Sequence, residues 1–176
     1  MAQGDLESAA AALDEAHHIV QHPPPSRWMT WRYATHCYVS LGELAFARGD
    51  LARAASWADQ SLEIATPTRS RKYESRAWRL KGDVATLRRT WDDAEQFLHR
   101  ASSIADEIAE PRSRWHALAA IGRYALVRGR RDDARRAYAT ASEIVDRIVI
   151  KVADAALRAG LEQSAVVREI RAQGRP

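Results

Sequence analysis

The chain has 176 residues, 46% of them hydrophobic, and a formal net charge of +4. This length suits one domain, which we place at residues 1–176, and no apolar run approaches the roughly 18 residues of a membrane-spanning helix, so we expect no membrane partner. The first residues lack the charged and apolar regions of a signal peptide, and Cys37 is the only cysteine, which excludes an internal disulfide and favours a cytoplasmic location.

The first predicted element is a single helix within residues 1–22, a half repeat that matches the second helix of a later unit. Leu6 and Ala9 precede Leu51 and Ala54 by 45 residues each. No earlier helix covers its apolar face, so we expect this end, or an apolar strip near the C-terminus, to join copies of the chain, unless a preceding part of a longer protein covers it. The apolar face consists of Leu6, Leu13, Ile19 and Val20.

Three full repeats follow, at residues 26–66, 69–110 and 112–147. The prolines at positions 23–25 are expected to form a rigid turn, and Ser26 to cap the next helix. In each repeat two apolar-periodic segments are joined by a short polar turn, which predicts a pair of helices. The predicted pairs are 28–48 with 51–65, 70–88 with 91–109, and 113–128 with 131–147.

Glycine and alanine recur at fixed positions in these repeats. The spacing of 40 residues relates Gly42, Gly82 and Gly122, then Ala45, Ala85 and Ala125, and then Ala54, Ala94 and Ala134. Glycine inside a helix costs about 1 kcal/mol relative to alanine, so its recurrence indicates a packing requirement. We expect Gly82 to let its helix approach the second helix of the pair closely at Ala94.

These residues resemble the tetratricopeptide repeat family, whose pattern has a large residue, then Leu-Gly, and a small residue in the second helix followed by a bulky one. The matching slots are Tyr38, Leu41, Gly42, Ala54 and Ala58, then Trp78, Lys81, Gly82, Ala94 and Leu98, then Leu118, Ile121, Gly122, Ala134 and Tyr138. The resemblance implies an all-α fold, a solenoid of antiparallel helical hairpins. The unit is about six residues longer than the family's 34, which predicts a longer second helix.

The period ends after residue 147, and residues 148–176 are predicted to form a cap with short helices at 154–163 and 165–172. Ile148, Val149, Ile150 and Val152 form the apolar strip before them. The short helices resemble those that close the repeat regions of large bacterial signal-transduction ATPases and cyclase-type regulators. That resemblance implies the C-terminal part of a larger bacterial regulator, whereas a terminal cap, which any stack of repeats needs, explains the same residues without it.

No catalytic activity, metal site or cofactor is expected from the sequence. His18 and His22 have a spacing that can bind a metal, but Pro23 disrupts the helical turn that would bring them together. Cys37 follows His36, yet adjacent helical positions point about 100° apart, so a buried cysteine is favoured over a nucleophile. The sequence also lacks a Walker-type phosphate loop.

The resemblance further implies a concave groove lined by positions two, five, nine and twelve of each first helix. Carried over by the glycine alignment, these positions are His36, Val39, Glu43, Phe46, Arg76, Arg79, Asp83, Thr86, His116, Ala119, Arg123 and Leu126. They mix charged and apolar side chains, which suits an extended peptide or a partner helix. We therefore expect a protein–protein interaction scaffold that binds a protein or peptide.

Three arginines of this groove favour an acidic segment of the partner. Arg76, Arg79 and Arg123 should stand on neighbouring first helices, where guanidinium groups can pair with carboxylates in a bidentate manner. Asp83 lies among them, placed to pair with Arg79 on its own helix and with Arg123 on the next. Such pairing would partly neutralise the arginines.

The alternative function is nucleic-acid binding through the basic stripe from Arg69 to Arg89. Clustered lysines and arginines can track phosphates. The second helix of the same repeat is acidic, with Asp92, Asp93 and Glu95 in its first turns. A solvated face balanced by that helix is the simpler interpretation, so nucleic acid is the less favoured partner.

Overall fold

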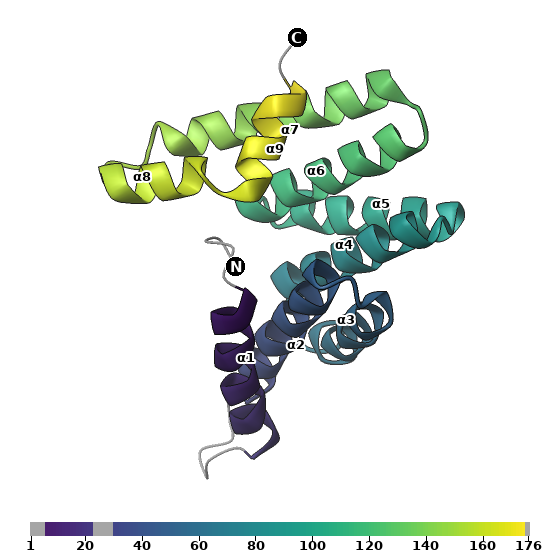
Figure 1. Cartoon of the computed structure of the whole chain (residues 1–176), viewed down its shortest axis with the longest axis vertical. Coiled ribbons are helices and arrows are strands. Elements are labelled where there is room, and N and C mark those ends of the chain that lie inside the picture. The colour runs from purple at the N-terminus through teal and green to yellow at the C-terminus, as the bar shows by residue number, and fades with distance from the viewer. Residues whose placement is uncertain (1–5, 23–29, 175–176) are drawn as a thin grey trace.

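The structure, a computed structural model, describes residues 6–22 and 30–174. Every regular element within these ranges is an α-helix, so the expected all-α class is confirmed (Figure 1). The helices are α1 (Leu6–Gln21), α2 (Thr30–Ala47), α3 (Leu51–Ala65), α4 (Arg71–Arg88), α5 (Trp91–Glu107), α6 (Pro111–Val127), α7 (Arg131–Val149), α8 (Ala155–Glu162) and α9 (Ala165–Gly174). None of these helices is long and apolar enough to cross a membrane. The predicted turn at positions 23–25, the cap at Ser26 and the first residues of the helix expected at 28–48 lie outside the described residues.

The observed helix boundaries lie close to the predicted ones. α3 spans residues 51–65, as predicted. α6 begins at Pro111, two residues early, because proline suits the first helical turn and the Glu110 carboxylate accepts a hydrogen bond from the Ser113 amide at 2.6 Å. α7 continues two residues beyond its expected end because Val149 is buried in the core cluster that α7 shares with α9.

The period of 40 residues is present in the backbone itself. In each turn between paired helices one residue has a positive φ, namely Gly49 at 80°, Arg89 at 60° and Gly129 at 73°. The amide of the next residue donates to an alanine carbonyl, from Asp50 to Ala45 at 2.9 Å, from Thr90 to Ala85 at 3.0 Å and from Arg130 to Ala125 at 2.8 Å. A left-handed residue with this closing hydrogen bond is a common way to end a helix, so the recurring alanines mark the ends of the first helices.

Gly82 and Gly122 make room for a bulky side chain of the second helix of their pair. A β-carbon at Gly82 would lie 2.5 Å from a terminal carbon of Leu98, and one at Gly122 would lie 2.5 Å from the ring of Tyr138. The predicted partner of Gly82 was therefore wrong by one helical turn. Ala94 is buried, but the next large residue on that face, Leu98, fills the space that the glycine leaves.

The paired helices form two layers along the molecule (Figure 1). α4 packs against both α2 and α6, and we call these three helices the inner row. α3 packs against α2 and α4, and α5 packs against α4 and α6, so each of these two second helices lies between two helices of the inner row, whereas α7 packs against α6 and α9. This arrangement brings equivalent positions of successive repeats onto neighbouring helices.

α1 packs on α2 at the N-terminal end of this arrangement. The His17 ring meets Tyr38 and Trp57 edge-on, with ring centroids 5.9 and 5.0 Å apart. Three of the four residues of the predicted apolar face are partly buried, whereas Ile19 is 53% exposed. Association of copies through this end stays a prediction.

The C-terminal apolar strip is divided between core and surface. Val149 is buried and Ile148 packs against the same cluster, whereas Ile150 is 80% exposed. α9 packs on α6 and α7, while α8 packs on α7 and α9 and holds no buried residue. Of the two C-terminal helices, α9 therefore contacts the inner row, through α6.

Candidate functional site

The inner row carries all twelve residues that were expected to line a groove, but their exposure differs widely. Val39 and Ala119 are buried in the hydrophobic core and are unavailable to a ligand. The buried residues are Val39, Asp83, Thr86 and Ala119, the partly buried ones are Glu43, Phe46, Arg76, Arg79, His116 and Arg123, and the exposed ones are His36 and Leu126. Charged and polar side chains thus make up most of the accessible surface of the row.

A continuous line of ion pairs, which we call the ionic ladder, crosses the inner row. Glu43 of α2 accepts a hydrogen bond from Arg76 at 2.7 Å and another from Arg79, both on α4. Arg79 donates to one carboxylate oxygen of Asp83 at 2.7 Å, and Arg123 of α6 donates to the other at 2.9 Å. The expected pairing of Asp83 with both arginines is confirmed. The members of the ladder are Glu43, Arg76, Arg79, Asp83, Arg123 and Glu169.

The ladder ends on the C-terminal helix. Arg123 donates to both carboxylate oxygens of Glu169 in α9, at 2.9 and 3.0 Å, and the Tyr138 hydroxyl of α7 donates to the same carboxylate at 2.6 Å. Burial lowers the pKa of Arg123, but Asp83 and Glu169 raise it by more. Burial and the hydrogen bond to Glu169 both raise the pKa of Tyr138, so its proton stays in place at neutral pH.

Pairing within the ladder compensates two of the three arginines that were expected to attract an acidic ligand. Arg79 and Arg123 each contact two carboxylates. Burial raises the pKa of Glu43, but Arg79 and Arg76 outweigh burial and lower it, so Glu43 stays ionised and paired. An external carboxylate would have to displace internal ones from this part of the row.

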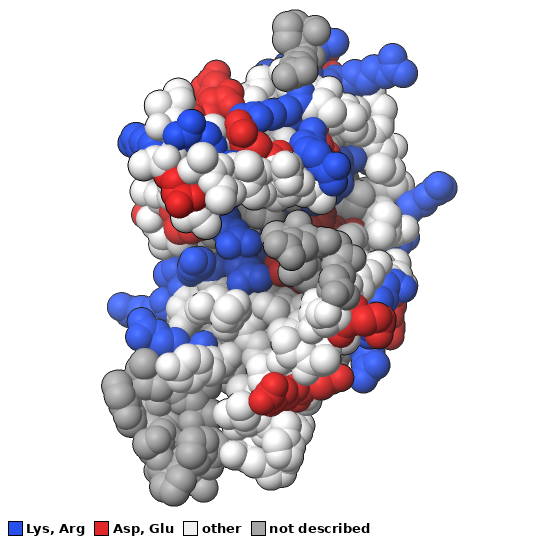
Figure 2. All heavy atoms as spheres, turned by 60° about the vertical axis from the view of Figure 1, so that its left-hand side comes forward, with Lys and Arg blue, Asp and Glu red and all other residues white. Residues whose placement is uncertain are grey.

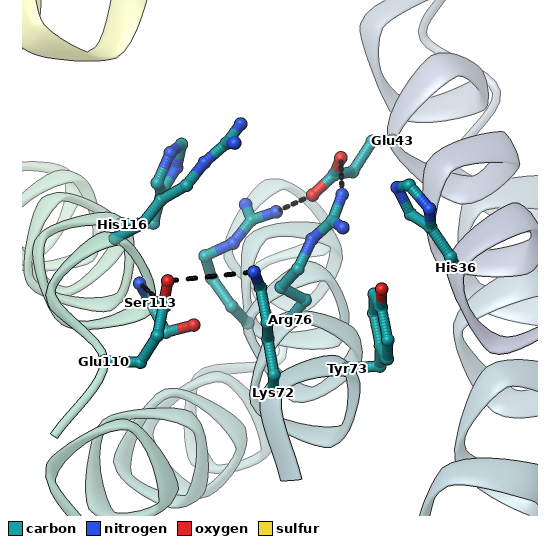
Figure 3. Close-up of a pocket in the computed structure, with 10 residues that line it drawn as sticks. His36, Glu43, Lys72, Tyr73, Arg76, Glu110, Ser113 and His116 are labelled. Atoms are coloured by element: carbon teal, nitrogen blue, oxygen red, sulfur yellow. Dashed lines mark hydrogen bonds and ion pairs between the residues drawn. The ribbon is translucent and has the colours of Figure 1, made fainter. Parts of the chain in front are cut away.

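Next to the ladder, at the N-terminal ends of α4 and α6, a pocket of about 200 Å³ opens in the inner row (Figure 3). Lys72, Arg76 and His116 point toward this space, and His36 and Tyr73 stand on its other side. We call it the cationic pocket. Its lining residues are His36, Glu43, Lys72, Tyr73, Arg76, Arg79, Glu110, Arg112, Ser113 and His116.

The pocket carries an excess of positive charge. Burial lowers the pKa of His116 to about 3, with Arg79 adding to the effect, and burial and Arg76 lower the pKa of His36. Both imidazoles are therefore neutral at pH 7. The charged lining residues are four cations, Lys72, Arg76, Arg79 and Arg112, and two carboxylates, Glu43 and Glu110. Arg79 also pairs with Asp83 of the ladder, so one positive charge is in excess. Figure 2 shows lysine and arginine side chains gathered beside the hollow between the two halves of the molecule.

The groove expected from the sequence does not include Lys72 and Arg112. Both occupy the second position of their helices, 40 residues apart and one turn before Arg76 and His116. Cations in the first turn oppose the helix dipole, which favours acidic residues there. Lys72 lies 3.8 Å from Glu110, and among the described residues Arg112 has no ion pair. Basic residues at this unfavourable position in successive repeats are the signal that could have located the pocket.

The basic stripe from Arg69 to Arg89 does not form one surface. Arg76 and Arg79 turn toward Glu43 of α2, as described above. Arg71 pairs with Glu74 and with Glu107 of α5, and Lys81 pairs with Asp59 of α3. The stripe is therefore divided among three neighbours of α4, and several of its charges are compensated.

His18, His22 and Cys37 do not line the pocket. The rings of His18 and His22 lie with centroids 4.6 Å apart and are tilted by 34°, and no group of three His, Cys, Asp or Glu side chains in the described ranges could hold a metal ion. Cys37 is buried, and burial raises the pKa of its thiol. A raised pKa lowers the thiolate fraction and with it the reactivity of the sulfur.

No protein-family model matches this chain, and no curated protein sequence matches it either. The function must therefore be inferred from the inner row and its pocket.

Proposed function

We propose that this chain is a protein–protein interaction scaffold, similar in architecture to the tetratricopeptide repeats, that holds an acidic segment of a partner protein against the inner row. The observation that carries the proposal is the cationic pocket, an open hollow between three helices in which Lys72 and Arg112 lie outside the ladder. Arg112 is exposed there and Lys72 is half exposed, so both can reach a ligand without breaking the ladder. Arginine and lysine pair most strongly with anionic oxygens, which selects an acidic partner.

An extended segment fits the row better than a small molecule does. From His116 in the pocket, α6 continues by ten residues to Leu126, which is 40% exposed, a distance of about 15 Å along the helix axis. Phe46 is partly exposed at the corresponding end of α2. A segment that places an acidic group in the pocket can therefore reach apolar contacts at the other end of the row, as groove-bound peptides do.

The test is a set of short fluorescent peptides of acidic, neutral and basic composition, with binding measured by anisotropy. We expect the acidic peptides to bind, and the variant Lys72→Glu with Arg112→Glu to bind them at least about tenfold more weakly, since charged hydrogen bonds contribute about 1.5–3 kcal/mol each. The control, Lys151→Glu with Arg168→Glu, makes the same change in net charge at exposed sites outside the pocket. Equal losses in both variants would show that net charge, and not the pocket, governs binding.

Nucleic acid is the alternative partner, favoured only by the basic stripe. A protein that neutralises six to ten phosphates loses about 10³–10⁵ in affinity between about 50 and 200 mM salt, whereas a pocket that engages a ligand through Lys72 and Arg112 loses far less. Measuring peptide and oligonucleotide affinities over this salt range separates the two functions. Tight, strongly salt-dependent binding of a single-stranded oligonucleotide would replace the scaffold by a nucleic-acid binder.

The proposal includes a setting for the scaffold. The single cysteine supports a cytoplasmic location, because a protein that folds in an oxidising compartment commonly pairs its thiols. The resemblance of the short C-terminal helices to those of large bacterial signal-transduction regulators supports a role as the repeat part of such a regulator. Comparing the chain with the protein encoded at its genomic locus tests this setting directly.

A further inference from the structure

We propose that the cationic pocket recognises the phosphate of a phosphorylated serine or threonine in the partner's acidic segment, an inference that rests on the proposed function. The pocket is then a phosphorylation-dependent subsite and not a general acid-binding surface. Three features favour a phosphate over a single carboxylate: the two cations that lie outside the ladder, the available donors of the lining and the place of the pocket on two helix ends.

A phosphate can engage both cations of the pocket that lie outside the ladder. Arg76 and Arg79 are paired with Glu43 and Asp83. Lys72 lies 3.8 Å from Glu110, and Arg112 has no ion pair among the described residues. A phosphorylated side chain carries a charge of about −1.5 to −2 at pH 7, whereas a glutamate carries one negative charge, so a phosphate attracts these two cations more strongly.

The donors of the lining also exceed what a carboxylate needs. Arg76 lines the pocket and donates to Glu43 through one terminal nitrogen, at 2.7 Å, so this hydrogen bond leaves its other guanidinium donors unused. Lys72 is held only by a 3.8 Å ion pair, and among the described residues Arg112 has none. These side chains approach the pocket from α4 and α6, and a phosphate offers three strong acceptor oxygens to such converging donors.

The position of the pocket explains why cations stand in the first turns of α4 and α6. Lys72 lies at the positive end of the α4 dipole and Arg112 at the positive end of the α6 dipole, and a cation at this position destabilises the helix. A bound dianion reverses the sign of that interaction, because anions are stabilised at helix N-terminal ends. Glu43 meanwhile holds Arg76 and Arg79 in place before the ligand arrives, so little side-chain entropy is lost on binding.

The experiment compares three versions of one short acidic peptide, with phosphoserine, glutamate or serine at its centre, by isothermal titration calorimetry. We expect the phosphoserine peptide to bind the intact chain about tenfold more tightly than the glutamate peptide, the factor that about 1.4 kcal/mol provides. Arg112→Gln should remove this preference. The matched control Arg114→Gln should keep it, because Arg114 lies two residues away on α6 and pairs with Asp106 outside the pocket.

A second measurement locates the bound anion. Inorganic phosphate and sulfate should shift the imidazole NMR signals of His36 and His116, whereas acetate at equal ionic strength should not. Equal affinity for the phosphoserine and glutamate peptides, with both weakened by Arg112→Gln, would overturn the phosphate preference and leave the acidic-segment function in place. Failure of all three peptides to bind, or binding that ignores Arg112→Gln, would overturn both.

Discussion

The two halves of the inner row use the same kinds of residue at repeated positions and reach opposite electrostatic states. In the closed half, toward the C-terminal ends of α4 and α6, Asp83 and Glu169 compensate Arg79 and Arg123, and the ladder closes on α9. In the open half, at the N-terminal ends of the same helices, where the cationic pocket lies, Arg112 has no ion pair among the described residues. The difference arises from outside the repeats, because Glu169 belongs to the cap. The repeats place the charged side chains on one surface. Glu169, which has no equivalent in the repeats, pairs with Arg123 and so helps to determine which arginines remain available to a ligand.

The largest effect should come from breaking the closed half at its centre. Asp83→Ala removes a side chain that is 5% exposed and leaves Arg79 and Arg123 each short of a partner, a change that typically costs about 3–5 kcal/mol. Urea unfolding followed by circular dichroism measures the loss. The control is Asp132→Ala, whose 82% exposed side chain pairs with Arg135 at 3.6 Å and should change stability by less than about 1 kcal/mol. Similar values for both variants would mean that the ladder adds no stability.

A smaller loss should follow when packing behind the ladder is disturbed. A methyl group at Gly122 would meet the Tyr138 ring, whose hydroxyl holds Glu169, so Gly122→Ala should cost about 1–3 kcal/mol through overpacking. Gly160→Ala is the control, since a β-carbon there meets open space and the higher helix propensity of alanine should stabilise α8 by about 0.5–1 kcal/mol. Opposite signs of the two changes in thermal midpoint are the expected result. A Gly122→Ala protein as stable as wild type would show that packing at Gly122 does not support the ladder.

The open half should respond to pH through His116. Burial lowers its pKa from 6.5 to about 3 in the folded chain. Between these values the unfolded chain binds a proton that the folded chain does not, so stability rises with pH by up to about 1.4 kcal/mol per unit. His116→Gln should flatten the dependence of the unfolding free energy between pH 5 and 6.5. Parallel profiles for wild type and variant would contradict the shift.

The smallest effect concerns the free cation of the open half. Arg112→Gln should leave stability unchanged or raise it by about 0.3–1 kcal/mol, because it removes a cation from the positive end of the α6 dipole. Differential scanning calorimetry of wild type and variant checks this. A loss of more than 1 kcal/mol would show that Arg112 has a structural partner and that the two halves are less different than proposed.

Much of the fold followed from the sequence because its determinants are local and repeated. Gly42, Gly82 and Gly122 located the helix pairs, and the spacing of Asp83 from Arg79 predicted an ion pair that the structure contains. The site was harder to predict. Val39 and Ala119 lie at groove positions but are buried, because neighbouring helices cover them.

Two features of the site, the pairing of Glu169 and the first-turn cations, could not be predicted from the pattern of a single repeat. Glu169 reaches Arg123 only because α9 folds back over α6 and α7, 46 residues further along the chain. Lys72 and Arg112 repeat with the period, but the family pattern used for the groove begins one turn after them. Burial across helices and the return of the cap are set by the whole chain, and a single repeat does not contain them.

The end of the ladder on α9 has a consequence for how the molecule unfolds. Stacked helical repeats contact only their neighbours, so they can lose structure one unit at a time from either end. Here Arg123 pairs both with Glu169 of α9 and with Asp83 of α4. Asp83 also pairs with Arg79, which in turn pairs with Glu43 of α2. Detachment of α9 would leave an arginine half satisfied in the middle of the row. The ionic ladder therefore couples repeats that are distant in the sequence. This coupling favours a single cooperative unfolding transition over stepwise fraying from the C-terminus.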